Sequence, residues 1–489
     1  MQMNNIENTV KQNSPNRPPV RRERDSLGEL DIDANRYWGV HTERAVQNFP
    51  ITGMSVGNFS ELIKALALVK LAAARANHKT GALPAAKCDA IGRACERILT
   101  EPDLASQFSV DVIQGGAGTS TNMNANEVIA NLAIEALGGT KGDYSVVSPH
   151  DDVNMSQSTN DAYPTALRLA VLFVAEPLLV ALERLAGEMS RKGHEFARIL
   201  KIGRTQLQEA VPMTLGQEFN AFAVTIREDI DRIREALLHF QEVNLGGTAI
   251  GTGLNATANY AKHAIAELST LSGFSMRQAH DLIEATSDMG AFVLFSGVLK
   301  RVAVKLSKIC NDLRLLSSGP GAGFAEIKLP AVQAGSSIMP GKINPVIPEV
   351  VNQVAYLVIG HDITVTMCAE GGQLQLNPFE PTIGYCVLSS IRYLTSSVNT
   401  LRERCISGIE ADEARCREGA EKSVGLITAL APLIGYEASA RIAKRALIEK
   451  RRIVDLVLEE GVLSAEAIRT ALSADAMTEP RHSKNEVRS

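Results

Sequence analysis

A polar segment rich in glycine and proline, Gly335 to Glu349 (GSSIMPGKINPVIPE), holds the residue types most able to do chemistry in this 489-residue chain. Ser336, Ser337, Lys342 and Asn344 place two hydroxyls, one cation and one amide close together. Such a set can bind a carboxylate and move a proton, because hydroxyls and amides exchange hydrogen bonds and lysine supplies positive charge. Long ordered loops in compact proteins are usually functional. A plain helix connector, with Ser336 as a cap and Lys342 in solvent, explains the same composition equally well.

Three further polar segments carry hydroxyl and amide side chains next to helical patterns. They are GTSTN with Thr119, QSTND with Ser158, Thr159 and Asn160, and GRTQLQ with Thr205 and Gln206. Short polar side chains before a helix start can bind a carboxylate through their hydroxyls and through backbone N–H groups. Taken alone, the first two segments are more typical of a helix N-cap than of a binding site.

Together these segments resemble the conserved regions of the aspartase/fumarase superfamily, which also contains argininosuccinate and adenylosuccinate lyases. The resemblance extends from Asp25 to about Gly461, nearly the whole chain. In that family the first serine of the Gly-Ser-Ser run is the catalytic base, and this position is Ser336 here. The family's lysine and asparagine that hold a substrate carboxylate correspond to Lys342 and Asn344, and its supporting glutamate corresponds to Glu349.

The resemblance also assigns the remaining contacts with a dicarboxylate substrate. Thr119, Ser158, Thr159 and Ser337 surround the β-carboxylate; Thr205 joins Lys342 and Asn344 at the α-carboxylate; Asn160 and Gln206 face the amino group. Three stretches favour an aspartase over a fumarase: GVHT at 39–42, VIPEVVNQ at 346–353, and Gln206, where fumarases carry histidine. Glutamine offers only fixed hydrogen bonds, which suits the orientation of an ammonium group. We therefore expect reversible deamination of L-aspartate to fumarate through an aci-carboxylate intermediate.

Two alternatives remain open at this point. The closest is a fumarate hydratase, against which Gln206 and the 346–353 stretch argue. The other is a non-catalytic structural protein that reuses the fold, as some lens crystallins do; it predicts losses among Ser336, Lys342 and Thr119, and none is lost. One departure is Ser148 to Asp151 (SPHD), which replaces a usual HPND. In fumarases that loop forms a secondary dicarboxylate site, and whether it binds a ligand here is open.

The elements that must position these residues are mainly helices. Aromatic residues make up only 4% of the chain although hydrophobic residues make up 45%, so alanine and leucine carry the apolar content and favour closely packed helices. Helical spacing begins near Glu61 and recurs over 84–100, from 125, and over 165–199, 215–243, 257–273, 279–317 and 346–370. The polar segments 114–124, 148–161, 203–213 and 244–255 are expected to be loops.

The resemblance implies a mostly α, three-domain aspartase/fumarase-like fold with a central bundle of long helices. The expected parts are a disordered arm at 1–20, an N-terminal domain at 21–157, the helical bundle at 158–413 and a small C-terminal helical domain at 414–489. In the family, helices of four subunits form the core and each active site takes loops from three chains. We therefore expect a homotetramer.

Composition excludes several other classes of protein. Net charge is −5 with both signs interspersed, which argues against nucleic acid and membrane surfaces as partners. The chain has no uncharged apolar run of about 18 residues, so we expect no transmembrane helix. The polar start lacks the apolar core of a secretion signal. The seven scattered cysteines are typical of reduced thiols in a cytoplasmic protein. The expected chemistry requires no cofactor and no metal; some family members are activated by magnesium, but no ligand cluster here demands it.

Overall fold

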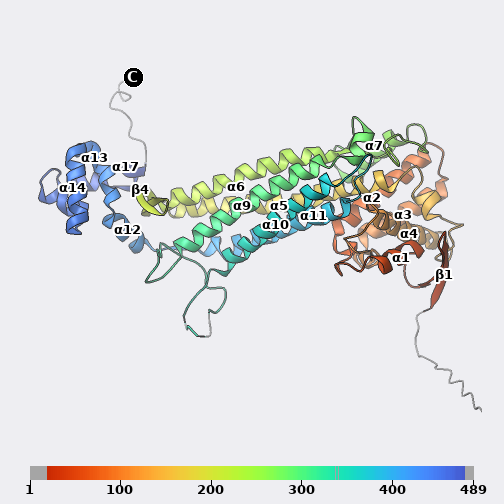
Figure 1. The fold of residues 1–489 in the computed structure, drawn as a ribbon, viewed down its shortest axis with the longest axis horizontal. Helices are drawn as coiled ribbons and strands as arrows, with labels where there is room; N and C mark the ends of the chain where they lie inside the picture. The colour runs from red at the N-terminus through yellow and green to blue at the C-terminus, as the bar shows by residue number, and fades with distance from the viewer. Residues whose placement is uncertain (1–18, 336–337, 340, 479–489) are drawn as a thin grey trace, which may run out of the picture. The chain divides into compact units, whose positions relative to one another are not determined.

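The computed structural model describes residues 19–335, 338–339 and 341–478, and these residues are mostly helical, as predicted (Figure 1). They divide into two compact units. Unit 1 comprises the chain up to Phe173 with 238–292 and 364–388, and unit 2 comprises 174–237, 293–363 and the chain from Ser389 onwards. The predicted arm at 1–20 lies outside the described residues apart from Pro19 and Val20.

Three alanine-rich helices form the centre of unit 1: α2 (Ser60–Lys79), α3 (Ala85–Thr100) and α4 (Thr119–Ala136). α2 packs against α3 and against α7 (Tyr260–Ser272), and α3 packs against α4. Small side chains allow this close approach, and Ala65, Ala72 and Ala125 have no exposed surface. The predicted helices from Glu61 and over 84–100 are confirmed within one residue at their starts.

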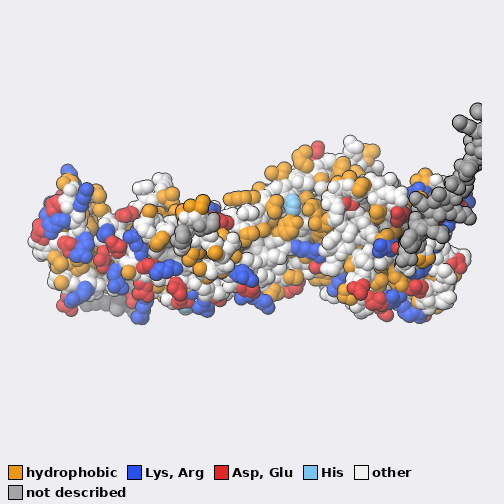
Figure 2. All heavy atoms as spheres, turned by 90° about the horizontal axis from the view of Figure 1, so that it is seen from below, with side chains coloured by type: hydrophobic (Ala, Val, Ile, Leu, Met, Phe, Trp, Pro, Cys, Tyr) orange, Lys and Arg blue, Asp and Glu red, His pale blue; other side chains and the backbone are white. Residues whose placement is uncertain are grey.

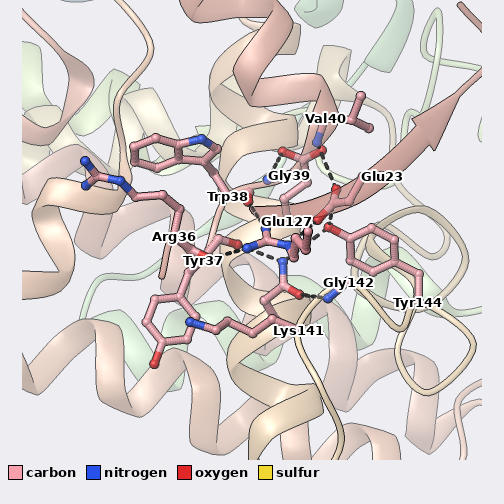
Figure 3. A network of polar contacts seen from close by, with 12 residues as sticks. Glu23, Arg36, Tyr37, Trp38, Gly39, Val40, Glu127, Lys141, Gly142 and Tyr144 are labelled. Atoms are coloured by element: carbon pink, nitrogen blue, oxygen red, sulfur yellow. Dashed lines mark hydrogen bonds and ion pairs between the residues drawn. The ribbon is translucent and has the colours of Figure 1, made fainter. Parts of the chain in front are cut away.

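The N-terminal hairpin of unit 1 pairs β1 (Val20–Asp25) with β2 (Gly28–Asp33) in antiparallel register. The first N–H groups of the next helix, α1 (Val40–Asn48), are bound by the buried carboxylate of Glu127 from α4 (Figure 3). Glu127 accepts hydrogen bonds from the N–H groups of Gly39, His41 and Thr42 at 2.9, 2.8 and 3.1 Å, and from Thr42 Oγ1 at 2.6 Å. Burial raises the pKa of Glu127 to about 7, and these donors oppose the shift.

Long helices run through the bundle of unit 2 (Figure 1). They are α6 (Leu215–Leu237) and the unit 2 parts of α5 (Thr159–Glu195), α9 (Gly290–Leu316), α10 (Val346–Glu370) and α11 (Glu380–Arg404). Buried polar side chains join neighbouring helices. Lys305 of α9 pairs with the fully buried Asp229 of α6 at 3.0 Å, and Lys300 pairs with Asp362 of α10 at 2.6 Å.

Among the described helices, α5 alone is long and apolar enough to cross a membrane. However, 72% of its most apolar stretch is buried inside the protein. That burial is the property of a core helix, as the alanine- and leucine-rich pattern predicted.

Three predictions of local structure were wrong. The helix expected over 279–317 is two, α8 (Leu282–Ser287) and α9, because extended Asp288 ends the first and its carboxylate accepts the Gly290 N–H at 2.8 Å. α4 begins at Thr119 and not near 125, since Gly118 turns the chain with a φ of 84°. The segment 203–213, expected to be a loop, forms most of a hairpin of β3 (Leu200–Thr205) and β4 (Gln208–Thr214).

Short helices follow Cys405 in unit 2. The described ones are α12 (Glu413–Lys422), α13 (Ile427–Ile434), α14 (Tyr436–Glu449), α15 (Ile453–Glu459), α16 (Ala465–Ala471) and α17 (Ala474–Thr478). They bury a small core of their own around Leu430, Ile442 and Leu456. Two of these short helices also contact the β3–β4 hairpin: α12 packs against β3, and α17 packs against β4.

Candidate active site

In unit 1 two helix starts carry hydroxyl side chains. Thr119 is the first residue of α4 and Thr159 is the first residue of α5. Asn122, one turn along α4, donates from Nδ2 to Oγ1 of Thr159 at 3.1 Å, so the two helix starts are neighbours. Both threonines are half-buried. The Thr119 hydroxyl donates to the Gly116 carbonyl at 2.7 Å and must turn before it can donate to a ligand.

A buried acid, Asp161, fixes the backbone next to the segment Ser158–Asn160. Asp161 has no exposed surface, and it accepts from the N–H groups of Ser158, Gly246 and Thr248 at 2.8, 2.9 and 3.0 Å. Burial raises the pKa of Asp161 to about 6, against the opposing effect of these donors. Asn160 donates from Nδ2 to the Ala249 carbonyl at 2.7 Å, which fixes its amide and leaves Oδ1 as an acceptor.

A fully buried lysine lies beneath these helix starts. Lys70 of α2 donates to Asn154 Oδ1 and to Gln157 Oε1, both at 2.9 Å. Asn154 Oδ1 also accepts from Asn122 Nδ2 at 3.2 Å, so the lysine and Thr159 are linked through two asparagines. Burial lowers the pKa of Lys70 to about 7. Sequence analysis missed this residue because one lysine inside a helical pattern gives no signal of its burial.

In unit 2 the hairpin β3–β4 carries Thr205 and Gln206 at its tip, and both side chains are exposed. Gln206 and Leu207 form a two-residue turn in which both have positive φ, 54° and 62°. Turns of this type strongly favour Asn-Gly or Gly-Gly, because other side chains are strained there. Gln206 therefore occupies a conformation that its own chemistry disfavours, and strained residues of this kind cluster at functional sites.

The remaining predicted residues belong to the segment before α10. Ser336 and Ser337 lie outside the described residues. Lys342 is exposed, whereas Asn344 is half-buried and lines a small cleft with Leu329, Pro330 and Cys405. Glu349 is in the first turn of α10, where its N–H donates to the Pro345 carbonyl at 3.1 Å. A carboxylate there is favoured by the positive end of the helix dipole.

The altered loop Ser148–Asp151 enters a short π-helical turn, η3 (Pro149–Val153). Ser148 Oγ accepts the Asp151 N–H at 3.0 Å and thereby caps this turn. The His150 ring meets the His41 ring edge-on at 5.8 Å between centroids. Burial, and secondarily the neighbouring His150, lower the pKa of His41. Among the described residues, no group of three or more His, Cys, Asp or Glu side chains is arranged to hold a metal ion.

The predicted residues are thus divided between the units. Unit 1 brings together Thr119, Ser158, Thr159 and Asn160 at two adjacent helix starts, which is an arrangement suited to an anion. Unit 2 holds Thr205 and Gln206 on a hairpin, and Lys342, Asn344 and Glu349 before and within the first turn of α10. Taken separately, the unit 1 residues offer hydroxyls and an amide, and the unit 2 residues offer a hydroxyl, amides and one lysine; each set contains groups that can bind a carboxylate.

Comparison with known proteins adds an independent finding. The sequence profile of the lyase family matches residues 28–360, and the profile of the fumarase C C-terminus matches residues 426–479. An aspartate ammonia-lyase of Pseudomonas aeruginosa is 58% identical over 94% of this chain and 97% of its own. The aspartate ammonia-lyase of Escherichia coli is 48% identical over 95% of this chain and 97% of its own.

Two solved structures share the fold. A fumarate lyase:delta crystallin from Brucella melitensis, in a crystal with cobalt, aligns with a TM-score of 0.92 and 57% identity over 94% of this chain and all of that one. A class II fumarase from Schistosoma mansoni aligns with a TM-score of 0.89 but only 32% identity, over 95% of this chain and all of that one. The match to aspartate ammonia-lyases is therefore clearly stronger than the match to a fumarase.

Proposed function

The chain belongs to the aspartase/fumarase superfamily, and on that premise we propose that it catalyses the reversible deamination of L-aspartate to fumarate and ammonia. The observation that carries the proposal is the identity of 48–58% to aspartate ammonia-lyases over about 94% of the chain, against 32% to a fumarase. Gln206 supports the same choice, because a neutral glutamine suits an ammonium leaving group.

The chemistry starts with removal of a weakly acidic proton from C3 of aspartate. Ser336 Oγ takes that proton, and the electron pair moves into the β-carboxylate to give the aci-carboxylate dianion. The dianion then collapses, the C2–C3 double bond forms, and the C2–N bond breaks to release ammonia. Backbone N–H groups of the loop from Gly335 to Met339 stabilise the Ser336 alkoxide.

Two negative charges on the β-carboxylate require donors aimed at its oxygens. Thr119, Ser158, Thr159 and Ser337 serve as these donors, and each preorganised donor contributes about 2.7–4 kcal/mol to transition-state stabilisation. The bond from Asn122 to Thr159 Oγ1 supports this role, since it leaves the Thr159 hydroxyl proton free for the ligand. The positive ends of α4 and α5 add to the attraction.

The other end of the substrate is held by charge and by amides. Lys342 and Asn344, with Thr205, bind the α-carboxylate, and Glu349 supports them. Asn160 and Gln206 accept hydrogen bonds from the ammonium group; the fixed amide of Asn160, with Oδ1 as its free acceptor, supports this orientation. These steps require no metal and no organic cofactor, so chelator-treated protein should still deaminate L-aspartate; added magnesium then tests for activation separately.

The proposal extends to a homotetramer in the cytoplasm whose active sites each combine residues of three chains. Exposed apolar side chains on α10 support an interface there: Tyr356, Leu357 and Ile363 are 59, 54 and 60% exposed. Apolar side chains also gather on the face of the molecule in Figure 2. Single exposed apolar side chains are ordinary on a protein surface, but several large ones on one helix are typical of a protein–protein contact.

Ultraviolet absorbance of fumarate tests the proposed function directly. Purified protein should form fumarate from L-aspartate and should release ammonia in equal amount, whereas L-malate should give little. Ser336→Ala should lower kcat roughly 10²- to 10⁴-fold, the usual contribution of a general base, with little loss of substrate binding. Turnover of malate in place of aspartate would identify a hydratase, and near-normal turnover by the variant would remove Ser336 as the base.

A further inference from the structure

A buried cluster of charges lies at the base of the β3–β4 hairpin in unit 2. Lys201 Nζ, on β3, is 2.6 Å from Glu218 Oε2 on α6 and 2.8 Å from Glu326 Oε2. The second oxygen of Glu326 is 2.7 Å from a guanidinium nitrogen of Arg204, also on β3. The side chains of Lys201 and Glu326 are only 2% and 4% exposed, and that of Arg204 is 19% exposed. One carboxylate therefore joins two cations of the same strand.

The backbone at Glu326 is itself firmly held. Its carbonyl accepts the Asp412 N–H at 2.9 Å, and the next two residues pair as β7 (Ile327–Lys328) with β8 (Glu410–Ala411). Arg415 donates to the Phe324 carbonyl at 3.1 Å from the start of α12. Glu326 is therefore a fixed point to which the hairpin is attached.

The hairpin needs such an attachment because its tip is strained. Gln206 and Leu207 both have positive φ, a conformation that costs non-glycine residues of order 1 kcal/mol or more each. A bulge weakens the ladder nearby: Ile202 faces Pro212 but Arg204 faces Glu209. Strain of this kind persists only where the surroundings over-determine the conformation. The ion pair at Arg204, whose guanidinium also lies 4.1 Å from the centre of the Phe324 ring, can do so from the residue next to Thr205.

We infer that Glu326 is a positioning residue for the substrate: through Arg204 and Lys201 it fixes the hairpin tip that presents Thr205 and Gln206. The inference rests on the proposed function for the identity of the ligand, an amino dicarboxylate. Glu326 does not touch that ligand. It acts through one strand, because Arg204 directly precedes Thr205.

The test compares Glu326→Gln with Glu218→Gln. Both substitutions are isosteric and both remove a carboxylate that contacts Lys201, at 2.8 and 2.6 Å, but only Glu326 reaches Arg204. Glu326→Gln should raise KM for L-aspartate about 10- to 100-fold, the loss of one or two hydrogen bonds to charged groups. Its kcat should change much less, because Thr205 and Gln206 bind ground state and transition state alike. Glu218→Gln should change both constants much less than Glu326→Gln, because Lys201 keeps Glu326 and Arg204 keeps its carboxylate partner.

A second variant keeps the test decisive if Glu326→Gln does not fold. Arg204→Gln breaks the same ion pair from its more exposed side, and it should raise KM similarly. Where both single variants fold, the KM of the double variant should not exceed the higher of the two single-variant KM values, because the two residues act as one unit. Additive losses, or a loss in kcat with KM unchanged, would overturn the inference.

Amide hydrogen exchange separates this inference from the proposed function. Exchange at residues 204–208 should speed up at least about tenfold in Glu326→Gln or Arg204→Gln and stay unchanged in Glu218→Gln, since local opening sets the rate. Wild-type protein that fails to deaminate aspartate would refute the function, and the exchange data would still decide whether Glu326 orders the tip. Unchanged exchange at the tip would refute the positioning role even in an active enzyme.

Discussion

Asn122 donates a hydrogen bond from Nδ2 to Oγ1 of Thr159 at 3.1 Å, and this contact decides which way the threonine hydroxyl points. A hydroxyl that accepts from an amide keeps its own proton for another partner. The proton is then available to a carboxylate at the starts of α4 and α5. Asn122 is almost fully buried, with 1% exposed surface, so its orientation is set by the protein and not by solvent.

Asn122→Asp should reverse this hydrogen bond without a change in shape. An aspartate can only accept, so it would draw the Thr159 proton away from the substrate. We expect kcat/KM for L-aspartate to fall roughly 100-fold, the effect of removing one preorganised donor. The same substitution in a Thr159→Val background should cost little more.

The matched control for that prediction is Asn124→Asp. Asn124 is equally buried on α4, but it donates to the Gln107 carbonyl at 2.9 Å, away from both hydroxyl-bearing helix starts. Steady-state kinetics on folded protein, checked by circular dichroism, should show a smaller loss for this control. Equal losses in the two variants would mean that buried charge alone, and not the direction of the Thr159 proton, lowers activity.

Gln206→Ala should separate the two ends of the substrate. Gln206 is assigned to the ammonium group, so the variant should bind L-aspartate about tenfold or more weakly, the loss of a hydrogen bond to a charged group. Succinate has both carboxylates but no amino group, and its inhibition constant should stay close to that of wild type. The comparison needs only competition kinetics. A parallel loss of succinate affinity would assign Gln206 to a carboxylate.

Glu380→Gln tests a buried acid at the start of α11. Both carboxyl oxygens of Glu380 are buried and have no hydrogen-bond partner among the described residues, and burial raises its pKa from 4.5 to about 8, with Arg168 opposing the shift. Between pH 4.5 and about 8 the folded chain therefore holds a proton that the unfolded chain has lost. Stability should fall as pH rises through this window, by several kcal/mol at most, since one pKa unit is about 1.4 kcal/mol.

Removal of the ionisable group should remove that slope. The thermal midpoint of Glu380→Gln should match wild type near pH 5 and exceed it increasingly towards pH 8, as measured by calorimetry at constant ionic strength. Glu235→Gln, a substitution on α6 whose side chain is 58% exposed, serves as the control and should run parallel to wild type. Parallel curves for Glu380→Gln would mean that Glu380 is ionised in the folded protein.

The fold was predictable from sequence where helical periodicity is strong. The predicted bounds 346–370 coincide with α10, and α2 and α3 begin within a residue of their predicted starts. The β3–β4 hairpin was missed because its turn, Gln206-Leu207, has neither the asparagine nor the glycine that marks such turns. The break at Asp288 was missed because one aspartate inside a long apolar pattern is a weak stop signal.

The candidate site was only partly readable from sequence. The hydroxyls at Thr119 and Thr159 stand out as short polar motifs at helix starts, and the structure brings those two helix starts together. The residues behind the Thr159 hydroxyl were not readable, because Asn122 and Lys70 act through contacts between segments far apart in the chain. Local patterns report the period of a helix, but they do not report which buried polar group meets which partner.

Ile363→Glu combined with Tyr356→Glu tests the proposed tetramer. These residues are two turns apart on α10, so they share one face of the helix, and each exposes about 60% of its surface in the single chain. Two charges buried in an apolar interface cost several kcal/mol each, because no partner compensates their lost hydration. Sedimentation velocity should therefore show smaller species than wild type, together with a loss of activity if sites are shared between chains.

Leu27→Glu, in the β1–β2 turn where Leu27 is 77% exposed, is the control and should sediment as wild type does. An intact tetramer in the double variant would exclude this face of α10 as an interface, and an active monomer would contradict the sharing of sites.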